Sequence, residues 1–219
     1  MADKDHLNMI ITGHIDNGKS TTMGHFLLDL GVVDERTISA HAKESEETGK
    51  GDSFKYAWVM DNIKDERARG ITIDLAFKKF ETPKFFFTLI DAPGHRDFVK
   101  NMITGASEAD CAVLVLSAKE GETDTAIAPG GQAREHAFLL KTLGVKQIIV
   151  AINKMDDSKF SEDAFNAAKQ KGEGLVKSVG YKLDDVPFVP VSGWTGENLV
   201  KKSENMPWYK GKTLLETFD

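Results

Sequence analysis

The sequence predicts an α/β fold, a doubly wound and mostly parallel six-stranded sheet with one antiparallel edge strand. Helical patterns separate most of the predicted strands, which is the order expected when helices cover both faces of a sheet. One further segment, Ile71–Lys78, alternates apolar and polar residues and predicts a strand with one exposed face. The remaining strands are predicted from continuous apolar runs, typical of strands covered on both faces, at residues 7–11, 85–90, 111–116, 147–152 and 188–191.

The first predicted strand leads into a phosphate-binding loop. Gly13–Ser20 reads G-x-x-x-x-G-K-S, and a helical stripe over Lys19–Leu30 follows, with Gly31 as its stop. Backbone N–H groups and the positive helix end then surround a polyphosphate. Lys19 adds a charge at the outer phosphates, and the Ser20 hydroxyl is a ligand for Mg²⁺. We expect the nucleotide contacts of this segment to come from His14, Asp16, Asn17, Gly18, Lys19, Ser20 and Thr21.

A long polar segment separates this helix from the edge strand. Asp34 is suited to cap a helix that runs to about Thr48. Insertions of this length are usually functional or mobile, although a solvated surface face explains the acidic helix equally well. Thr72 lies just after the insertion, where it could bind Mg²⁺ only while a γ-phosphate is present. The insertion is therefore a candidate switch.

The chain then turns sharply at Thr82-Pro83-Lys84. A connection this short cannot make a parallel crossover, so the edge strand and the strand after it should form an antiparallel hairpin. Asp91 follows that strand at the usual place of a Walker-B carboxylate, which holds Mg²⁺. Three residues further along the chain, the Gly94 amide can contact the γ-phosphate. His95, which follows Gly94 directly, would lie where a residue must orient the attacking water.

The base is selected by a second motif. Asn153-Lys154-Met155-Asp156 follows the strand at 147–152. The Asp156 carboxylate can accept hydrogen bonds from N1–H and the exocyclic amine of guanine, and adenine has neither donor at those positions. The Lys154 stem can lie along the flat base, and Asn153 can tie this loop to the phosphate loop. After the last strand, backbone N–H groups for the guanine oxygen come from Ser192, Gly193 and Trp194.

The rest of the chain predicts further helices. Gln132–Leu143 reads as one helix, stopped by Gly144, and Glu162–Val179 as another. Within the second, Phe165, Leu175, Val176 and Val179 are expected to face inward. Residues 212–219 read either as a short helix or as the start of a linker.

Length, charge and cysteine content restrict the number of domains, the binding partners and the cellular compartment that we expect. The length of 219 residues suits one large domain, or one domain with a tail. A net charge of −6 gives no global basic field, so we expect no DNA binding and only a local patch for RNA. The sequence contains no apolar run long enough for a membrane span and no secretory signal core near Met1. The single cysteine, Cys111, lies in an apolar run and is expected to be a buried structural thiol, which fits a soluble cytoplasmic protein.

The order of these motifs resembles that of translational GTPases, a P-loop GTPase class. Residues 54–61, 66–74, 91–105 and 134–136 resemble the elongation factor 1-alpha family of archaea and eukaryotes, whose helical switch insertion bacterial elongation factor Tu lacks. The resemblance implies GTP, GDP and Mg²⁺ as ligands and slow GTP hydrolysis without the ribosome. It also implies delivery of aminoacyl-tRNA to the ribosomal A site, and a guanine-nucleotide exchange factor that releases GDP.

The resemblance also implies roles for individual residues. His95 positions the attacking water behind a hydrophobic gate formed by Ile15 and Ile71, and Asp16 holds either a monovalent cation or the loop itself. Positions that meet the tRNA acceptor end match Phe98, Lys100 and Asn101. Ala133, Gly172 and Gly174 look unusual for the family and touch none of the nucleotide motifs.

The same resemblance predicts the domain organisation. The family continues into two C-terminal β-barrel domains, whereas this sequence stops at Asp219, so residues 1–219 are expected to be the GTP-binding domain alone. Such a domain should bind and slowly hydrolyse GTP but carry tRNA poorly, because the barrels build part of the aminoacyl pocket.

Three alternatives remain open. The GTPase domain of a release or ribosome-rescue factor is disfavoured by residues 54–74. A P-loop ATPase or kinase would bind ATP more tightly than GTP, so the role of Asp156 decides this case. A non-catalytic interaction module would bind GTP without releasing phosphate.

Overall fold

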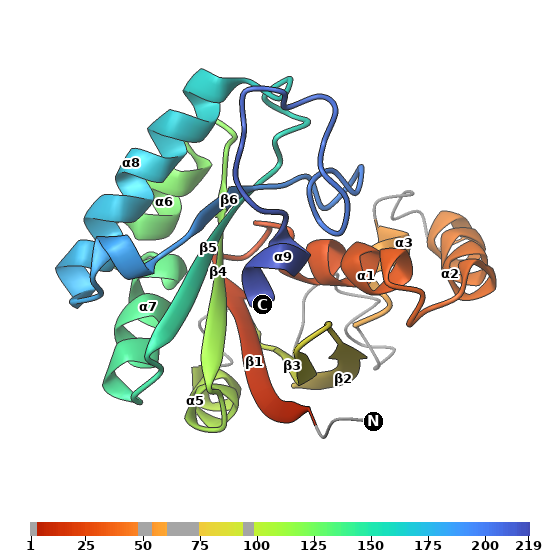
Figure 1. The fold of residues 1–219 in the computed structure, drawn as a ribbon, viewed down its shortest axis with the longest axis horizontal. Coiled ribbons are helices and arrows are strands. Elements are labelled where there is room, and N and C mark those ends of the chain that lie inside the picture. Colours follow the sequence, from red (N-terminus) through yellow and green to blue (C-terminus); the bar gives the residue numbers. More distant parts are fainter. Residues whose placement is uncertain (1–3, 48–53, 61–74, 94–98) are drawn as a thin grey trace.

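The computed structural model describes residues 4–47, 54–60, 75–93 and 99–219, which contain a six-stranded sheet of order β2-β3-β1-β4-β5-β6 (Figure 1). Neighbouring strands are parallel except β2, which pairs antiparallel with β3 at the edge. This arrangement confirms the predicted fold class and the hairpin. The strands are β1 (Asp5–Gly13), β2 (Ala76–Glu81), β3 (Phe85–Asp91), β4 (Cys111–Ser117), β5 (Gln147–Asn153) and β6 (Phe188–Pro190).

Helices cover both faces of the sheet. The described helices are α1 (Lys19–Asp29), α2 (Glu35–Glu47), α3 (Phe54–Ala57), α5 (Val99–Ser107), α6 (Glu122–Ile127), α7 (Gln132–Thr142), α8 (Glu162–Val179), the 3-10 helix η2 (Leu183–Asp185) and α9 (Leu214–Phe218). Helices α1, α7 and α8 match the predicted ranges to within one residue at either end. The sequence patterns did not indicate α5 and α6, which are short.

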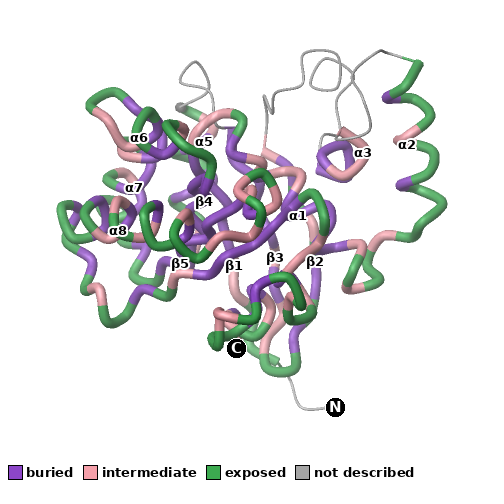
Figure 2. Tube along the Cα trace, turned by 90° about the horizontal axis from the view of Figure 1, so that it is seen from above, coloured by how far each residue is buried: buried purple, intermediate pink, exposed green. Residues whose placement is uncertain are grey.

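The sheet separates two apolar cores. Along β1, Ile10 faces one core while Met9 and Ile11 face the other, because successive side chains of a strand point to opposite faces. The first core packs against α5, α6, α7 and α8, and the second against α1 and α9. Figure 1 shows α6, α7 and α8 on one side of the sheet and α1 on the other. Figure 2 shows the consequence, since the central strands are mostly buried and α2 is mostly exposed.

The insertion before the edge strand begins as the sequence predicts. A carboxylate oxygen of Asp34 accepts a hydrogen bond from the backbone N–H of Thr37 at 2.7 Å, which caps the first turn of α2. Only Ile38 and Ser45 of α2 are buried. The helix therefore presents a mainly solvated face, which the sequence left as one of two interpretations.

The edge strand differs from its predicted alternation. Phe77, grouped with the apolar positions in the sequence pattern, is 50% exposed, whereas Ala76 and Phe80 are buried. The hairpin register places Phe80 opposite Phe87 of β3 on the face of the second core, with ring centroids 5.1 Å apart, and places Phe77 opposite Ile90 on the other face, at the edge of the sheet. Residues 71–74, the first half of the predicted strand, lie outside the described residues.

One glycine within α8 has a packing role. A Cβ on Gly172 would lie 2.9 Å from the Phe188 ring and 3.0 Å from a Leu116 methyl group, so the helix approaches the sheet closely there. The predicted inward residues Phe165, Leu175, Val176 and Val179 are all buried. The cost of glycine in a helix, about 1 kcal/mol relative to alanine, is thus offset by close packing.

The last element and the single cysteine match their predictions. Residues 212–219 contain the short helix α9, held by a capping box between Thr213 and Glu216. Cys111 is buried, and burial raises the pKa of its thiol to about 12. It therefore stays protonated and unreactive at neutral pH.

Candidate functional site

The predicted motifs meet at one edge of the sheet. Strands β1, β3 and β5 are members of the parallel part of the sheet and end at Gly13, Asp91 and Asn153. Carboxyl ends of parallel strands lie together, and ligands of open α/β sheets bind there. The phosphate-binding loop, the Walker-B carboxylate and the N-K-M-D motif are therefore neighbours in space.

The loop folds around the side chain of Lys19. The Nζ of this buried lysine donates a hydrogen bond to the backbone oxygen of His14 at 2.9 Å. Asp16 and Gly18 both have positive φ, 63° and 80°, a conformation that costs a non-glycine residue free energy and is concentrated at functional sites. Thr21 lies in the first turn of α1. The loop thus presents a helix N-terminus and an ammonium group, the two requirements of a phosphate site.

Ser20 and Asp91 lie in direct contact beside this loop. The Ser20 hydroxyl donates to the Asp91 carboxylate at 2.8 Å, and Asp91 is fully buried at the end of β3. A hydroxyl and a carboxylate are hard oxygen donors of the kind that Mg²⁺ prefers. These two residues fit the predicted metal site.

Several predicted residues cannot be placed in the site. Ile71, Thr72, Gly94, His95 and Phe98 lie outside the described residues. Their roles therefore remain predictions from the sequence.

Asn153 joins the phosphate loop to the base loops, as the sequence predicts. Its Nδ2 donates to the backbone oxygen of Asn17 at 2.8 Å, and its Oδ1 accepts from the backbone N–H of Gly193 at 2.8 Å. A Cβ on Gly18 would lie 2.5 Å from this Nδ2, so only glycine permits the approach. Asn17 is fixed a second time, since its own Nδ2 donates to the Val115 oxygen at 2.9 Å.

Asp156 is held by the loop that follows β6. The Ser192 hydroxyl donates to one Asp156 carboxylate oxygen at 2.5 Å and accepts from the backbone N–H of Thr195 at 3.1 Å. The contact orients the carboxylate before any ligand binds. The backbone N–H of Ser192 donates to Glu197, and that of Gly193 donates to Asn153. A guanine oxygen would share the Gly193 donor or use the backbone N–H of Trp194, a residue that is 39% exposed.

Glu122 is a residue of the site that sequence reasoning missed. Its carboxylate accepts a hydrogen bond from the Lys154 ammonium group at 2.7 Å. Burial raises the pKa of Glu122, but hydrogen bonds from Lys154 and Ser117 and the charges of Lys154 and Lys119 lower it more, leaving it below its ordinary value. No sequence signal links residues 122 and 154, because the contact depends on how α6 is placed on the sheet.

A recess borders the loop on the side of α6. Its volume is about 320 Å³, and the loop residues Ile15, Asp16 and Asn17 line it together with Gly121 and Glu122. Of the two residues of the predicted hydrophobic gate, Ile15 is described by the structure, and it lines this recess beside the phosphate loop.

A buried histidine contacts the end of β1, directly before the phosphate loop. His136 of α7 contacts the Thr12 hydroxyl through Nδ1 at 2.7 Å. Burial, followed by the nearby charges of Lys19 and His14, lowers the pKa of His136 to about 3. The imidazole is therefore neutral in the folded protein at all physiological pH values.

This histidine should make stability depend on pH. Its pKa is near 6.5 in the unfolded chain and about 3 in the folded protein, so the unfolded chain binds the extra proton. Its contribution is present above pH 6.5 and is lost as the pH falls toward 3. Between pH 7.5 and pH 5, this residue alone should lower the free energy of unfolding by about 2 kcal/mol.

Urea unfolding of wild type and His136→Gln at both pH values measures the effect. The variant should lose that part of the pH dependence. His6→Gln, at an exposed histidine, provides the comparison that assigns a change in slope to position 136. Equal slopes for His136→Gln and wild type would rule out a buried neutral imidazole.

Within the ranges that the structure describes, no helix combines the length and the apolar character needed to cross a bilayer.

Comparisons with known proteins agree with this geometry. A family model described as "Elongation factor Tu GTP binding domain" matches residues 4–219. Elongation factor 1-alpha of Cenarchaeum symbiosum (strain A) is 85% identical over 219 residues, which are 100% of this chain and 50% of that protein. The protein of the same name from Plasmodium falciparum (isolate K1 / Thailand) is 56% identical over 99% of this chain and 49% of its own length. The chain thus spans about half the length of these curated relatives.

Solved structures give a consistent result. Sup35 complexed with GDP matches with a TM-score of 0.73 and 33% identity, over 100% of this chain and 45% of that chain. The Saccharomyces cerevisiae Ski7 GTPase-like domain, bound to GTP, matches with a TM-score of 0.82 and 25% identity, over 98% of this chain and 49% of that chain.

Proposed function

Since the chain belongs to the elongation factor Tu GTP-binding domain family, we propose that its site binds GTP and GDP together with Mg²⁺ and hydrolyses GTP. The supporting observation is the pair of hydrogen bonds by which Asn153 joins the phosphate loop to the base loops. Because of this link, the triphosphate and the purine are bound by one rigid unit.

The phosphates would be held at the N-terminus of α1. Backbone N–H groups of residues 14–21 surround them, and Lys19 contributes the charge at the outer phosphates. Ser20 and Asp91 would hold Mg²⁺, with Thr72 joining in the triphosphate state. When bound, Mg²⁺ neutralises charge that develops on the phosphate oxygens.

The base would be recognised through Asp156. Its carboxylate, already oriented by Ser192, accepts from N1–H and the exocyclic amine of guanine. With adenine the same carboxylate finds no donor, so a partly buried charge loses its partners on binding. Lys154 lies along the base, and a loop amide of Gly193 or Trp194 donates to the guanine oxygen.

Hydrolysis would depend on residues of the switch side. His95 orients the attacking water, and Ile15 with Ile71 restricts its access until the ribosome provides the stimulus. A separate exchange factor would then release GDP. Without these partners we expect slow turnover.

A protein that contains this domain would act in the cytoplasm as a carrier of aminoacyl-tRNA to the ribosomal A site. The high identity to elongation factor 1-alpha over the whole chain supports this assignment. Phe98, Lys100 and Asn101 would contribute to the contact with the acceptor end. Stable tRNA binding would require the part of the relatives that this chain does not span.

Nucleotide binding and single-turnover phosphate release test the proposal. We expect GTP and GDP to bind at least about 100-fold more tightly than ATP, and removal of Mg²⁺ to weaken GTP binding. Tighter ATP binding would support an ATPase or kinase instead. Tight GTP binding without phosphate release would support a non-catalytic interaction module.

A further inference from the structure

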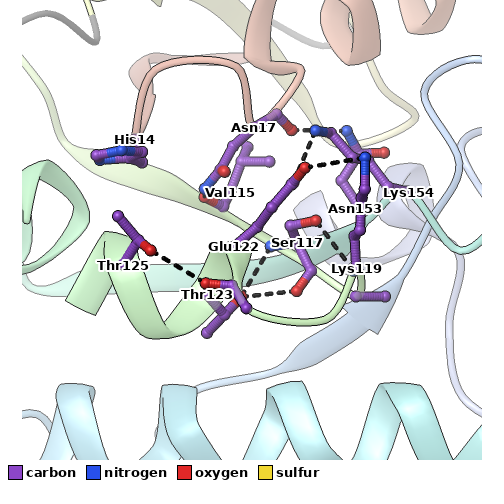
Figure 3. A network of polar contacts seen from close by, with 12 residues as sticks. His14, Asn17, Val115, Ser117, Lys119, Glu122, Thr123, Thr125, Asn153 and Lys154 are labelled. Atoms are coloured by element: carbon purple, nitrogen blue, oxygen red, sulfur yellow. Dashed lines mark hydrogen bonds and ion pairs between the residues drawn. The ribbon is translucent and has the colours of Figure 1, made fainter. Parts of the chain in front are cut away.

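The ion pair between Glu122 and Lys154 connects two elements that are far apart in the sequence. Lys154 Nζ donates to one Glu122 carboxylate oxygen at 2.7 Å, and Lys119 Nζ lies 3.5 Å from the other. Figure 3 shows the Glu122 side chain reaching from the start of α6 toward these ammonium groups, beside Asn17 and Asn153. The contact therefore lies between the phosphate loop and the base motif.

The backbone that carries Glu122 is held in place. Thr123 Oγ1 donates to the Ser117 oxygen at 2.6 Å and accepts from the Ser117 N–H at 3.2 Å, which fixes the first turn of α6 to the end of β4. Ser117 is in turn paired with Asn153 across the sheet. Glu122 is thus supported by the same strand ends that carry the base motif.

Lys154 is restricted on both sides along the chain. Its φ is 63°, Asn153 makes the two hydrogen bonds described above, and Asp156 is held by Ser192. The backbone is therefore fixed, and the remaining freedom lies in the four-carbon side chain. A lysine of this kind ordinarily samples many rotamers, and fixing its ammonium group removes most of them.

On the basis of the proposed function, we propose that Glu122 is a positioning residue for the guanine base. It holds the Lys154 ammonium group so that the lysine stem lies across the base pocket before the nucleotide binds. The stem then covers the flat face of the base without losing rotamer freedom at the moment of binding. Glu122 itself touches no reacting atom.

The expected consequence is a change in nucleotide release. Glu122→Gln removes the carboxylate charge, so the ion pair with Lys154 is replaced by a weaker hydrogen bond from the ammonium group to a neutral amide oxygen. We expect the dissociation rate of fluorescent (mant) GDP, in the presence of Mg²⁺, to increase about tenfold. Glu122→Asp, which shortens the side chain by one methylene group, should give an intermediate rate.

Asp124→Asn is a matched control on the same helix. It removes a carboxylate whose oxygen lies 2.7 Å from Lys171, the same separation as in the Glu122 pair, but on the exposed side toward α8. We expect no change in GDP release. An equal acceleration in both variants would show that α6 is merely destabilised and would overturn the proposal.

The decisive measurement uses a Lys154→Met background, which retains an apolar stem but has no ammonium group. Adding Glu122→Gln there should not accelerate GDP release further, because Glu122 acts through that group. A tenfold effect that persists in the Lys154→Met background would contradict the proposal.

The two proposals fail in different ways. If wild type binds no guanine nucleotide, the proposed function itself is wrong. If wild type binds GDP tightly and both Glu122→Gln and Glu122→Asp release it at the wild-type rate, only the role of Glu122 is wrong.

Discussion

Asp156→Asn is expected to lower the affinity for GTP about 1,000-fold and to create a preference for xanthosine triphosphate. The carboxylate is oriented by the Ser192 hydroxyl at 2.5 Å, and an amide at this position replaces one acceptor by a donor. The N1–H and exocyclic amine of guanine, both donors, would then face the NH₂ donor of the asparagine amide. Xanthine has a carbonyl oxygen where guanine has the amine, so it restores a matched pair.

Competition between GTP and xanthosine triphosphate for the variant measures this exchange. The neighbouring substitution Asp157→Asn, at an exposed aspartate, removes the same charge from the same loop and should leave the GTP preference intact. An Asp156→Asn variant that still prefers GTP would show that Asp156 does not contact the base.

Asn153→Ala is expected to have the second largest effect, because it removes a buried connector. The Asn17 oxygen and the Gly193 N–H would lose their partner inside the protein. Two buried groups left without hydrogen bonds should lower the free energy of unfolding by about 3 kcal/mol. GTP affinity should fall about 100-fold, since the phosphate loop and base loops are no longer held together.

Asn198→Ala provides a control of the same residue type. Asn198 is also buried, and its Nδ2 donates to the Pro190 oxygen at 2.8 Å. Loss of this one buried hydrogen bond should lower the free energy of unfolding by about 1.5 kcal/mol, while GTP affinity stays nearly normal. If both variants lose GTP binding equally under conditions where both are folded, Asn153 has only a structural role.

Much of the fold was predictable because local patterns and tertiary structure agree. Strands buried on both faces, such as β4 and β5, are continuous apolar runs, and α8 begins and ends at the predicted residues. The link from Asn153 to the phosphate loop was also predicted, since both motifs follow strands of one parallel sheet. These features depend on sequence periodicity and strand direction.

Other features depend on three-dimensional placement that no local pattern records. Phe77 is exposed on the edge strand although the residue opposite it, Ile90, is buried, and the alternation in the sequence does not record this position in the sheet. Helix α6 has six residues, too few for a clear helical period. Its carboxylate at Glu122 reaches Lys154 only because α6 packs beside the end of β4. The close approach of Gly172 to Phe188 has the same origin.

The inert state of Cys111 has a practical consequence for labelling. Because this is the one cysteine of the sequence and its thiol remains protonated and buried, maleimide dyes should react very slowly with the folded protein. A single cysteine introduced at an exposed position could then carry a fluorophore without removal of the native one. Energy transfer between such a dye and a labelled nucleotide would then report the distance from the dye to the bound nucleotide, in a protein whose buried core carries no substitution.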